Sequence, residues 1–410
     1  MTVSMPVRRG GSTLAGASRT SPGWLRRVDW LLLAAVAGLL VIGALLVWSA
    51  TLHREDLTGG NEDAYLRKQV INAAIGLVLG GVVAATDHRW LRLWAPVLYA
   101  ASAVGLALVF VPGVGATING SHSWLLVGGL SLQPAEMAKF GVVLGMAFVL
   151  AERSEAHLRH GVNAVDVVPA LAIAAVPALL ILAQPDLGTL MVLTVTVFGV
   201  VGLSGAPKRW LFLLAGGGAA VVVFAVQSGL LAGYQLDRFG AFTDPSLDPQ
   251  GAGYNTQQAR IAIGNGGITG QGLFNGTQTQ AGFVPEQHTD FVFTVAGEEL
   301  GLVGAAAIVA LFALLLWRAL RIARQADDLF GRVTAVGIAC WFGFQAFQNI
   351  GMCLGIMPVT GVPLPLVSYG GTSMFASLTA VGLLLNVHLR TAGRPGHGVV
   401  VQERMARSRF

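Results

Sequence analysis

The sequence predicts an all-α, polytopic integral membrane protein with ten transmembrane helices. Of its 410 residues, 54% are hydrophobic and only 11% are charged, whereas soluble domains carry about 25% charged residues. The mean hydropathy is +0.66, and the apolar runs are long enough to cross a bilayer, which takes about 20 residues. A net charge of +5 would suggest a nucleic-acid partner for a soluble protein. We expect none here, because the basic residues follow membrane topology.

The predicted helices begin after a polar tail. Residues 1–28 are rich in Gly, Ser, Thr and Arg and lack apolar periodicity, which predicts a disordered cytoplasmic tail. The first apolar run exceeds the roughly 7–15 residues of a signal-peptide core and lacks a clear cleavage site, so we expect it to remain as an anchor. The ten predicted helices cover residues 29–50, 69–87, 93–111, 133–151, 165–183, 188–206, 209–229, 291–317, 332–354 and 364–388.

Both termini are predicted to be cytoplasmic. With the N-terminus inside, 20 of the 26 basic residues fall in cytoplasmic segments, five fall outside and Lys139 lies within a helix. This asymmetry is the one that the positive-inside rule requires. The predicted organisation is therefore a cytoplasmic tail over 1–28, a transmembrane domain over 29–390 and a second cytoplasmic tail over 391–410.

Two predicted extracytoplasmic segments interrupt the helices. Residues 112–132 are Gly-rich and end in an apolar stretch, which favours a re-entrant or interfacial segment. Residues 230–290 form a loop between predicted helices seven and eight, and loops of this length are commonly functional. Within that loop, residues 257–263 have helical character and the glycines of 264–272 predict turns.

Polar chemistry concentrates where the long loop re-enters the membrane, at Glu286, His288 and Asp290. A carboxylate there, close to intramembrane charges, indicates a functional site, although Asp290 and Thr289 could instead only cap the following helix. In an extended segment the three side chains would share one face and could bind a divalent cation. The spacing fits no zinc pattern, so we expect no tightly bound metal.

Three other ionisable residues lie at membrane depth or at its edge. Glu136 and Lys139 are three residues apart near the outer end of predicted helix 133–151, so they share a helix face and can pair. Such a pair either lines a cavity or only orients helices. Asp186 follows Pro185 at a predicted outer turn, where it either caps the next helix or belongs to the same site.

Several short motifs follow one another through the chain. They include Asn119-Gly120…Trp124, Gln133-Pro134-Ala135-Glu136, Gln184-Pro185-Asp186-Leu-Gly188, Pro285-Glu286-Gln-His288-Thr289-Asp290-Phe291 and Pro365-Leu-Val-Ser368-Tyr369-Gly370-Gly371. In these motifs, which cover roughly residues 30–390, the chain resembles the SEDS family (shape, elongation, division and sporulation) of peptidoglycan glycosyltransferases. It looks like the elongation member RodA rather than the division member FtsW, because Gly276-Thr-Gln278-Thr-Gln280 precedes the Pro-Glu motif.

The resemblance implies a function and a partner. The expected activity is polymerisation of lipid II, a disaccharide peptide linked to undecaprenyl pyrophosphate, into glycan strands at the outer face of the bacterial cytoplasmic membrane. The expected partner is a cognate class B penicillin-binding protein, which supplies crosslinking. The resemblance also implies that Asp290 is the catalytic residue and that Glu136, Lys139 and Asp186 line the cavity.

The reaction requires one base and one positive charge. The donor is α-linked and the product β-1,4-linked, so a single inverting displacement suffices, and pyrophosphate leaves without needing the general acid of a glycosidase. We assign Asp290 as the base for the acceptor 4-hydroxyl. Arg260, Lys139 or a loosely held Mg²⁺ or Mn²⁺ would stabilise the leaving group, with Arg238 as a weaker candidate, and no tightly bound cofactor is expected. Glu286 and His288 complete the predicted substrate-binding set.

Two other classes of function fit part of the sequence. A lipid-linked precursor transporter, or flippase, would also use ten helices and a charged cavity, but its essential charges would be Glu136 and Lys139 rather than Asp290. A non-enzymatic scaffold would use the long loop only as an interaction surface. Within the SEDS family, a division-type role is the alternative to elongation.

Overall fold

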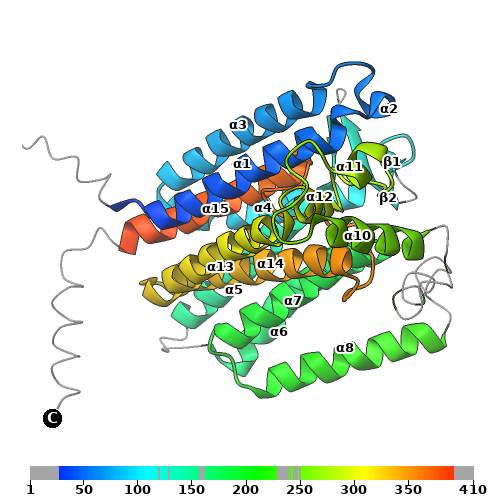
Figure 1. The fold of residues 1–410 in the computed structure, drawn as a ribbon. Coiled ribbons are helices and arrows are strands. Elements are labelled where there is room, and N and C mark those ends of the chain that lie inside the picture. Colours follow the sequence, from blue (N-terminus) through cyan, green and yellow to red (C-terminus); the bar gives the residue numbers. More distant parts are fainter. Residues whose placement is uncertain are drawn as a thin grey trace, which may run out of the picture.

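Long apolar helices run side by side through the part of the chain that the computed structural model describes, which is residues 27–118, 121–127, 130–156, 162–228, 240, 242, 248 and 251–391 (Figure 1). The elements are α1 (Trp30–Leu52), α2 (Glu55–Thr58), α3 (Ala64–Ala85), α4 (His88–Leu108), β1 (Gly115–Ile118), β2 (Ser121–Val127), β3 (Leu130–Leu132), α5 (Pro134–Ala156), α6 (Ala164–Ala183), α7 (Leu187–Leu203), α8 (Arg209–Gln227), α10 (Ala252–Gly266), α11 (Thr277–Ala281), α12 (Val292–Glu299), α13 (Gly301–Gln325), α14 (Leu329–Leu354) and α15 (Gly371–Thr391).

The predicted polytopic, helical membrane fold is confirmed. Among the described residues, eight helices are long and apolar enough to cross a membrane, and α7 is a shorter apolar helix. Each of the ten predicted helices has a helical counterpart, and the number of crossings stays a prediction. The predicted tails lie almost entirely outside the described residues.

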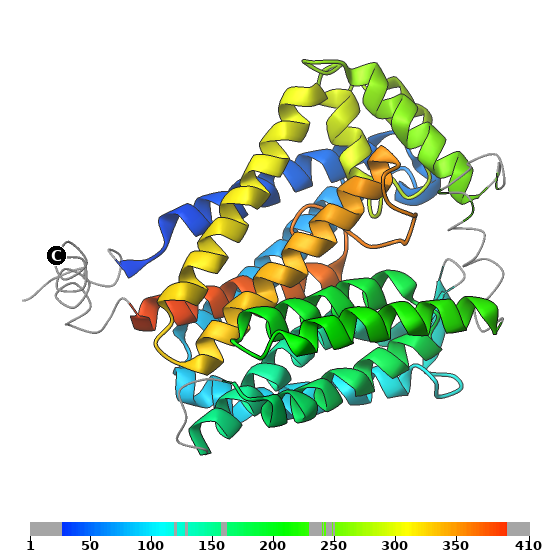
Figure 2. The ribbon, with the colours of Figure 1, turned by 90° about the horizontal axis from the view of Figure 1, so that it is seen from below.

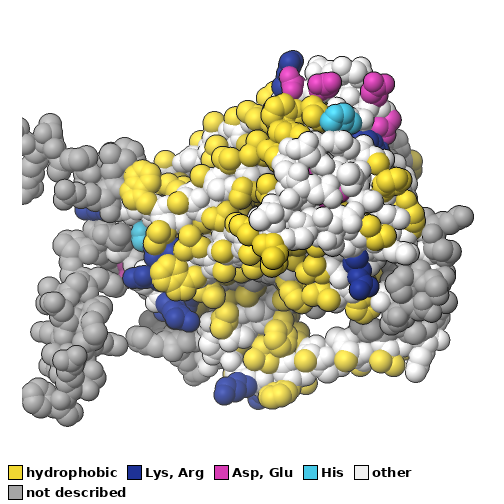
Figure 3. Space-filling view, viewed as in Figure 1, with side chains coloured by type: hydrophobic (Ala, Val, Ile, Leu, Met, Phe, Trp, Pro, Cys, Tyr) yellow, Lys and Arg dark blue, Asp and Glu magenta, His cyan; other side chains and the backbone are white. Residues whose placement is uncertain are grey.

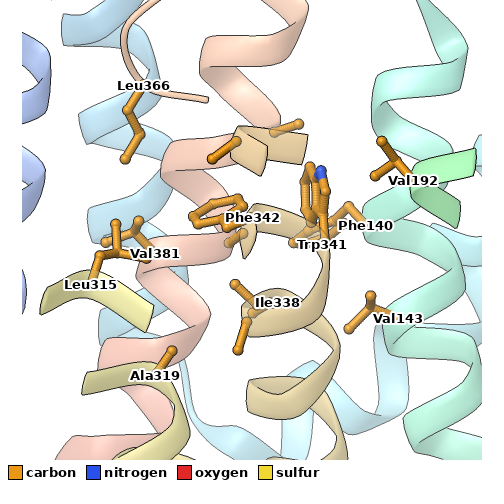
Figure 4. Close-up of a cluster of buried hydrophobic side chains, with 14 of the residues drawn as sticks. Phe140, Val143, Val192, Leu315, Ala319, Ile338, Trp341, Phe342, Leu366 and Val381 are labelled. Atoms are coloured by element: carbon orange, nitrogen blue, oxygen red, sulfur yellow. The ribbon is translucent and has the colours of Figure 1, made fainter. Parts of the chain in front are cut away.

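Helix α14 is the centre of the bundle. Its side chains Ile338, Trp341 and Phe342 are surrounded by apolar side chains of α5, α7, α13 and α15 (Figure 4). The apolar windows of α5, α14 and α15 are 83%, 72% and 72% buried, against 17% for α3 and 22% for α4. The inner helices are thus buried by protein, whereas α3 and α4 expose apolar faces that suit contact with lipid.

The two ends of the bundle differ. The start of α1 and the end of α15 lie at one end, and α2, the strands, α10 and α11 lie at the other (Figure 1). Helix α8 overlaps α7 in the view of Figure 2, but Figure 1 shows that it diverges from the rest of the bundle. Hydrophobic side chains cover much of the helix flanks, and acidic side chains gather at the end that carries α2 (Figure 3). The termini of the helical domain therefore share a face, as the predicted topology requires.

The described residues of segment 112–132 contain a small sheet, and the predicted re-entrant or interfacial position of this segment stays a prediction. Strands β1, β2 and β3 are antiparallel neighbours in that order, with Ala116 opposite Trp124 and Leu125 opposite Leu132. In β2, Ser123 and Leu125 are buried whereas His122 and Leu126 are exposed. This alternation is the period of a half-buried strand, and the Gly-rich composition concealed it.

The predicted helix 291–317 is two helices. Helix α12 ends at Glu299 and α13 starts at Gly301, which has a φ of +65°. Backbone of the 266–270 turn packs against this break, because Leu302 N donates to Gly267 O at 2.9 Å and Gln271 N donates to Glu298 O at 3.0 Å. Only glycine fits at Gly301, since a Cβ there would collide with the backbone of Gly270 and Ile268. The break between α12 and α13 therefore fixes the position of the 266–271 turn against α12.

The predicted helix 364–388 begins seven residues late, at Gly371. Residues 356–370 form an irregular segment that is mostly buried inside the bundle. Pro363 and Pro365 disfavour a helix there, and Leu366 has a φ of +65°. Irregular backbone at membrane depth must be satisfied by other protein groups, and the groups that do so here lie beside the residues predicted to carry the chemistry.

Candidate functional site

The segment 283–291 is a series of turns rather than an extended strand. Glu286 has a φ of +50°, and its carbonyl accepts from Thr289 N at 3.2 Å and Asp290 N at 3.0 Å. The prediction that Glu286, His288 and Asp290 share one face of an extended segment is therefore wrong. Among the described residues, no group of three His, Cys, Asp or Glu side chains is placed to hold a metal ion.

Asp290 is partly exposed and does not occupy the N-cap position, which belongs to Phe291. Its carbonyl accepts a hydrogen bond from Asn349 Nδ2 of α14 at 2.7 Å. Its carboxylate faces Gly361 of the irregular segment, where an added Cβ would lie 3.3 Å from Oδ2. Gly361 is exposed and has a φ of +70°. The carboxylate of Asp290 therefore lies beside Gly361, the one exposed residue of segment 358–362.

The ring of His288 lies in an aromatic cluster with Tyr65 and Tyr369. Its ring lies 5.1 Å from the Tyr65 ring and 5.8 Å from the Tyr369 ring, measured between centroids. Its carbonyl accepts from Tyr369 N at 2.9 Å, which ties the loop to the irregular segment. Burial lowers the pKa of His288 below its usual value of about 6.5, so the ring is neutral at pH 7. Glu286 is partly exposed, and its Oε2 accepts from the Thr289 hydroxyl at 3.1 Å.

Glu136 and Lys139 form the predicted ion pair. Lys139 Nζ lies 2.6 Å from Glu136 Oε1 and 2.7 Å from Gln345 Oε1, and it stands 5.3 Å from the centre of the Trp341 ring. Lys139 is 0% exposed and Glu136 is 2% exposed. The ammonium is thus enclosed by protein groups, and an anionic ligand could reach it only after displacing one of them.

Asp186 is the N-cap of α7, as one of the two predictions for it required. Its carboxylate accepts from Thr189 N at 2.9 Å and from the Thr189 hydroxyl at 2.8 Å. Gln133 Nε2 lies 3.4 Å away, which connects Asp186 to the start of α5 and hence to the ion pair. Its enclosure by protein raises the pKa of the Asp186 carboxyl, while the hydrogen bonds from Thr189 oppose that shift.

Arg260 lies on α10, within the predicted helical stretch of the long loop, and its side chain is exposed. Its aliphatic part packs against Gly355, which ends α14 with a φ of +74°. Arg260 therefore stands at the C-terminal end of the helix that also contacts Asp290 and Lys139. Among the basic residues predicted for the site, Arg260 is exposed and Lys139 is not, whereas Arg238 lies outside the described residues.

Sequence reasoning missed the amides of α14. Gln345, Gln348 and Asn349 are buried, and their side-chain nitrogens hold the irregular segment. They donate to Pro363 O at 2.8 Å, to the Thr360 hydroxyl at 2.6 Å and to Val362 O at 2.8 Å, respectively. The signal was present in the sequence, because three amides at i, i+3 and i+4 in an apolar run mark one polar face of a helix.

These contacts join the predicted residues into two centres. Asp290 and its loop lie on Asn349, and the Glu136–Lys139 pair lies on Gln345, one turn earlier in α14. The segment 360–363 spans both centres, because it is held by both amides. Asp186 adjoins the second centre, Arg260 lies at the end of α14, and His288 belongs to the aromatic cluster beside the first.

The fold and this site define a class: polytopic membrane proteins that place a carboxylate on an accessible rim above a buried, charged bundle interior. The chain belongs to the FtsW, RodA and SpoVE family, because the family model described as "Cell cycle protein" matches residues 29–392. This family is the one that the sequence motifs resembled.

Relatives named as enzymes match nearly the whole chain. It is 39% identical over 369 residues to "Peptidoglycan glycosyltransferase MrdB" of Escherichia coli K12, covering 88% of this chain and 93% of that protein. It is 36% identical over 366 residues to "Probable peptidoglycan glycosyltransferase FtsW" of Trichlorobacter lovleyi, covering 89% and 94%. These identities are similar, so the elongation subtype stays a prediction.

Solved structures share the fold. The crystal structure of the rod shape determining protein RodA of Thermus thermophilus matches with a TM-score of 0.64 and 33% identity, covering 91% of this chain and 100% of that one. A chain from the structure described as "Structural coordination of polymerization and crosslinking by a peptidoglycan synthase complex" matches with a TM-score of 0.72 and 34% identity, covering 90% and 99%.

Proposed function

We propose that this protein is a peptidoglycan glycosyltransferase of the bacterial membrane that polymerises lipid II into β-1,4-linked glycan strands. Relatives named peptidoglycan glycosyltransferase support the activity class. The observation that carries the reaction is the carboxylate of Asp290, which is partly exposed and faces the bare backbone of Gly361. It lies in the segment that joins α11 to α12, toward the end of the bundle predicted to be extracytoplasmic.

In the proposed reaction, Asp290 takes the proton from the acceptor 4-hydroxyl as this oxygen attacks the donor anomeric carbon. The bond from that carbon to the pyrophosphate oxygen breaks, and the configuration inverts from α to β. Pyrophosphate leaves as an anion and needs positive charge rather than a proton. We assign that charge to Arg260, which is exposed. A Mg²⁺ or Mn²⁺ ion held loosely from solution would add to this positive charge.

Lys139 is the weaker candidate for the leaving group in this arrangement. Its ammonium is 0% exposed and is enclosed by Glu136, Gln345 and Trp341. We therefore give the ion pair the role of holding α5 to α14 beneath the reacting groups. Glu286 is partly exposed beside Asp290 and remains a proposed contact for the sugar, whereas the buried ring of His288 shapes the loop.

The proposed partner is a class B penicillin-binding protein. One structural relative is described as part of a peptidoglycan synthase complex that coordinates polymerization and crosslinking. A transpeptidase would crosslink the strands that this chain produces, so both activities are needed for a continuous wall. The end of the bundle that carries α2, α10 and α11 is where such strands would emerge.

The test is the substitution Asp290→Asn, which keeps the size of the side chain and removes the base. We expect polymerisation of labelled lipid II, in the presence of the partner, to fall by about 10²–10⁴-fold, the usual contribution of a general base. The control is Asp63→Asn, since Asp63 is a partly exposed carboxylate at the same end of the bundle, 3.7 Å from Arg67.

A glycan ladder from the wild type and from Asp63→Asn, but not from Asp290→Asn, would support the proposal. Substantial activity of Asp290→Asn would move the base elsewhere, with Glu286 the next candidate. If the wild type polymerised nothing and instead moved lipid II across liposome membranes, the transporter alternative would replace this proposal.

A further inference from the structure

Asn349 connects segment 283–291, which carries Asp290, to the irregular segment 356–370 through a single amide. Its Nδ2 donates to Asp290 O at 2.7 Å and to Val362 O at 2.8 Å. The side chain is 0% exposed, and its Oδ1 has no hydrogen-bond partner. Because both neighbours are carbonyl oxygens, which only accept, the NH₂ group must face them. Both of its N–H donors are therefore used to join two segments that are remote in sequence.

We propose that Asn349 is a positioning residue for the glycosyl transfer, and that it keeps the carboxylate of Asp290 opposite the backbone of Gly361. This inference rests on the proposed function. The amide holds the main chain of the proposed base itself, and no step of the reaction requires it to touch substrate.

The surrounding contacts show how α14 holds the irregular segment opposite Asp290. Of the four residues in segment 360–363, Thr360, Val362 and Pro363 are held by side chains of α14. Gly361 is the fourth, and it is the residue that faces Asp290 Oδ2. Fixing its neighbours presents Gly361 to the carboxylate at a set distance. The position of the Asp290 carboxylate relative to Gly361 is thus set by α14.

Loss of the amide would leave both segments less firmly held. Asp290 and Val362 would each lose the hydrogen bond to their backbone carbonyl. Misplacement of a reacting group by about 1 Å can cost roughly 100-fold in rate. The substrate would still bind to its other contacts, so the loss should appear in kcat more than in KM.

The test compares Asn349→Leu with Asn386→Leu. Both changes replace a buried amide by an apolar side chain of similar size. Asn386 Nδ2 donates to Val83 O at 3.0 Å, Ala84 O at 3.1 Å and Thr86 O at 2.6 Å, and it lies near the end of α15, away from Asp290. Each variant removes a side-chain donor from backbone carbonyls inside the bundle, although Thr86 O keeps a donor in Arg390 Nη2 at 3.1 Å, so both should lose stability.

The measurement is the steady-state rate of lipid II polymerisation, with the partner present, per mole of protein that elutes as a folded monodisperse species. We expect kcat of Asn349→Leu to fall by about 10–100-fold with KM changed by less than about threefold, and kcat of Asn386→Leu to stay within about twofold of the wild type. Asn349→Ser, whose hydroxyl can satisfy one of the two carbonyls, should lie between the wild type and Asn349→Leu.

The Asn349→Ser variant carries the test if Asn349→Leu does not fold. The inference is overturned if the Asn349 variants that fold keep wild-type kcat, if their loss is confined to KM, or if Asn386→Leu loses kcat equally. A wild-type protein that does not polymerise lipid II would overturn the proposed function first, and the inference with it. An active wild type with fully active Asn349 variants would overturn the inference alone.

Discussion

Removing one member of the Glu136–Lys139 pair should be far more harmful than removing both. The two charges lie 2.6 Å apart with 2% and 0% exposure, so the variant Lys139→Met leaves a carboxylate buried without a counter-ion. Breaking a buried pair in this way costs about 3–5 kcal/mol, whereas replacing the whole pair by neutral side chains is often close to neutral. We therefore expect Glu136→Gln and Lys139→Met each to lose about 3–5 kcal/mol, and the double variant to lose only about 1–2 kcal/mol.

The contacts around the pair explain why the double variant should recover. Gln345 Oε1 keeps the hydrogen bond from Trp341 Nε1 at 2.6 Å after Lys139 is replaced. Its Nε2 keeps the bond to Pro363 O, so the irregular segment stays attached to α14. A methionine fills most of the volume of the lysine chain. The remaining loss is then the hydrogen bonding of the ammonium, without an unpaired buried charge.

The assay is reversible unfolding in mixed detergent micelles, followed by far-ultraviolet circular dichroism. The control is Glu155→Gln, which weakens an exposed pair with Arg92 whose Nη2 lies 2.8 Å from Glu155 Oε2. Exposed pairs contribute only about 0.2–1 kcal/mol. The reasoning fails if Lys139→Met costs no more than Glu155→Gln, or if the double variant loses the sum of the two single losses.

The same variants separate the two roles predicted for Lys139. Weaker binding of the lipid-linked substrate by folded Lys139→Met would give the ammonium a part in substrate binding, as the sequence suggested. Unchanged binding would leave it the role of joining α5 to α14, which its enclosure favours. The measurement is equilibrium binding of labelled lipid II to the folded fraction.

Two further predictions concern the loop that carries Asp290. Glu298 is 0% exposed and accepts from Gln278 N at 2.7 Å, Thr279 N at 2.9 Å and the Thr279 hydroxyl at 2.7 Å. Glu298→Leu should therefore lower the free energy of unfolding by about 2–4 kcal/mol and make α11 more sensitive to limited proteolysis. Cleavage of this variant at the wild-type rate would contradict the prediction. The pKa of His288 is lowered by burial, so its contribution to stability is complete above the unfolded value of about 6.5 and is lost as the pH falls toward the folded value. The thermal midpoint should therefore drop more between pH 7.5 and 5.5 in the wild type than in His288→Gln, and equal drops would rule out this ring as the cause.

Apolar length and charge were enough to predict most of this fold. The helix positions followed from runs of spanning length, and the Glu136–Lys139 pair followed from i,i+3 spacing alone. The sheet at 115–132 was missed because only β2 shows a strand period, and its first half is short and polar. The break at Gly301 was missed because an apolar run does not show where a loop from elsewhere in the chain will pack against it.

The candidate site was predicted in part and for the same physical reasons. Charged residues stand out against an apolar background, so the ionisable positions could be named from the sequence. The amides of α14 could not be assigned roles, because their partners are carbonyls of an irregular segment that the hydropathy pattern predicted to be helical. The enclosure of Lys139 depends on Gln345, which lies 206 residues further along the chain.

The irregular segment 356–370 can be completed only when synthesis of the chain is nearly finished. Gln69, in the second long helix to be made, donates to the carbonyls of Val367 and Ser368, which are 298 and 299 residues further on. Helix α3 also packs along α15, the last helix in the part of the chain that the structure describes. The first helices therefore lack these partners of Gln69 until residues 367 and 368 have been synthesised. A nascent chain that stops short should be open to membrane proteases, so cellular quality control of this protein is expected to depend on whether α15 has arrived.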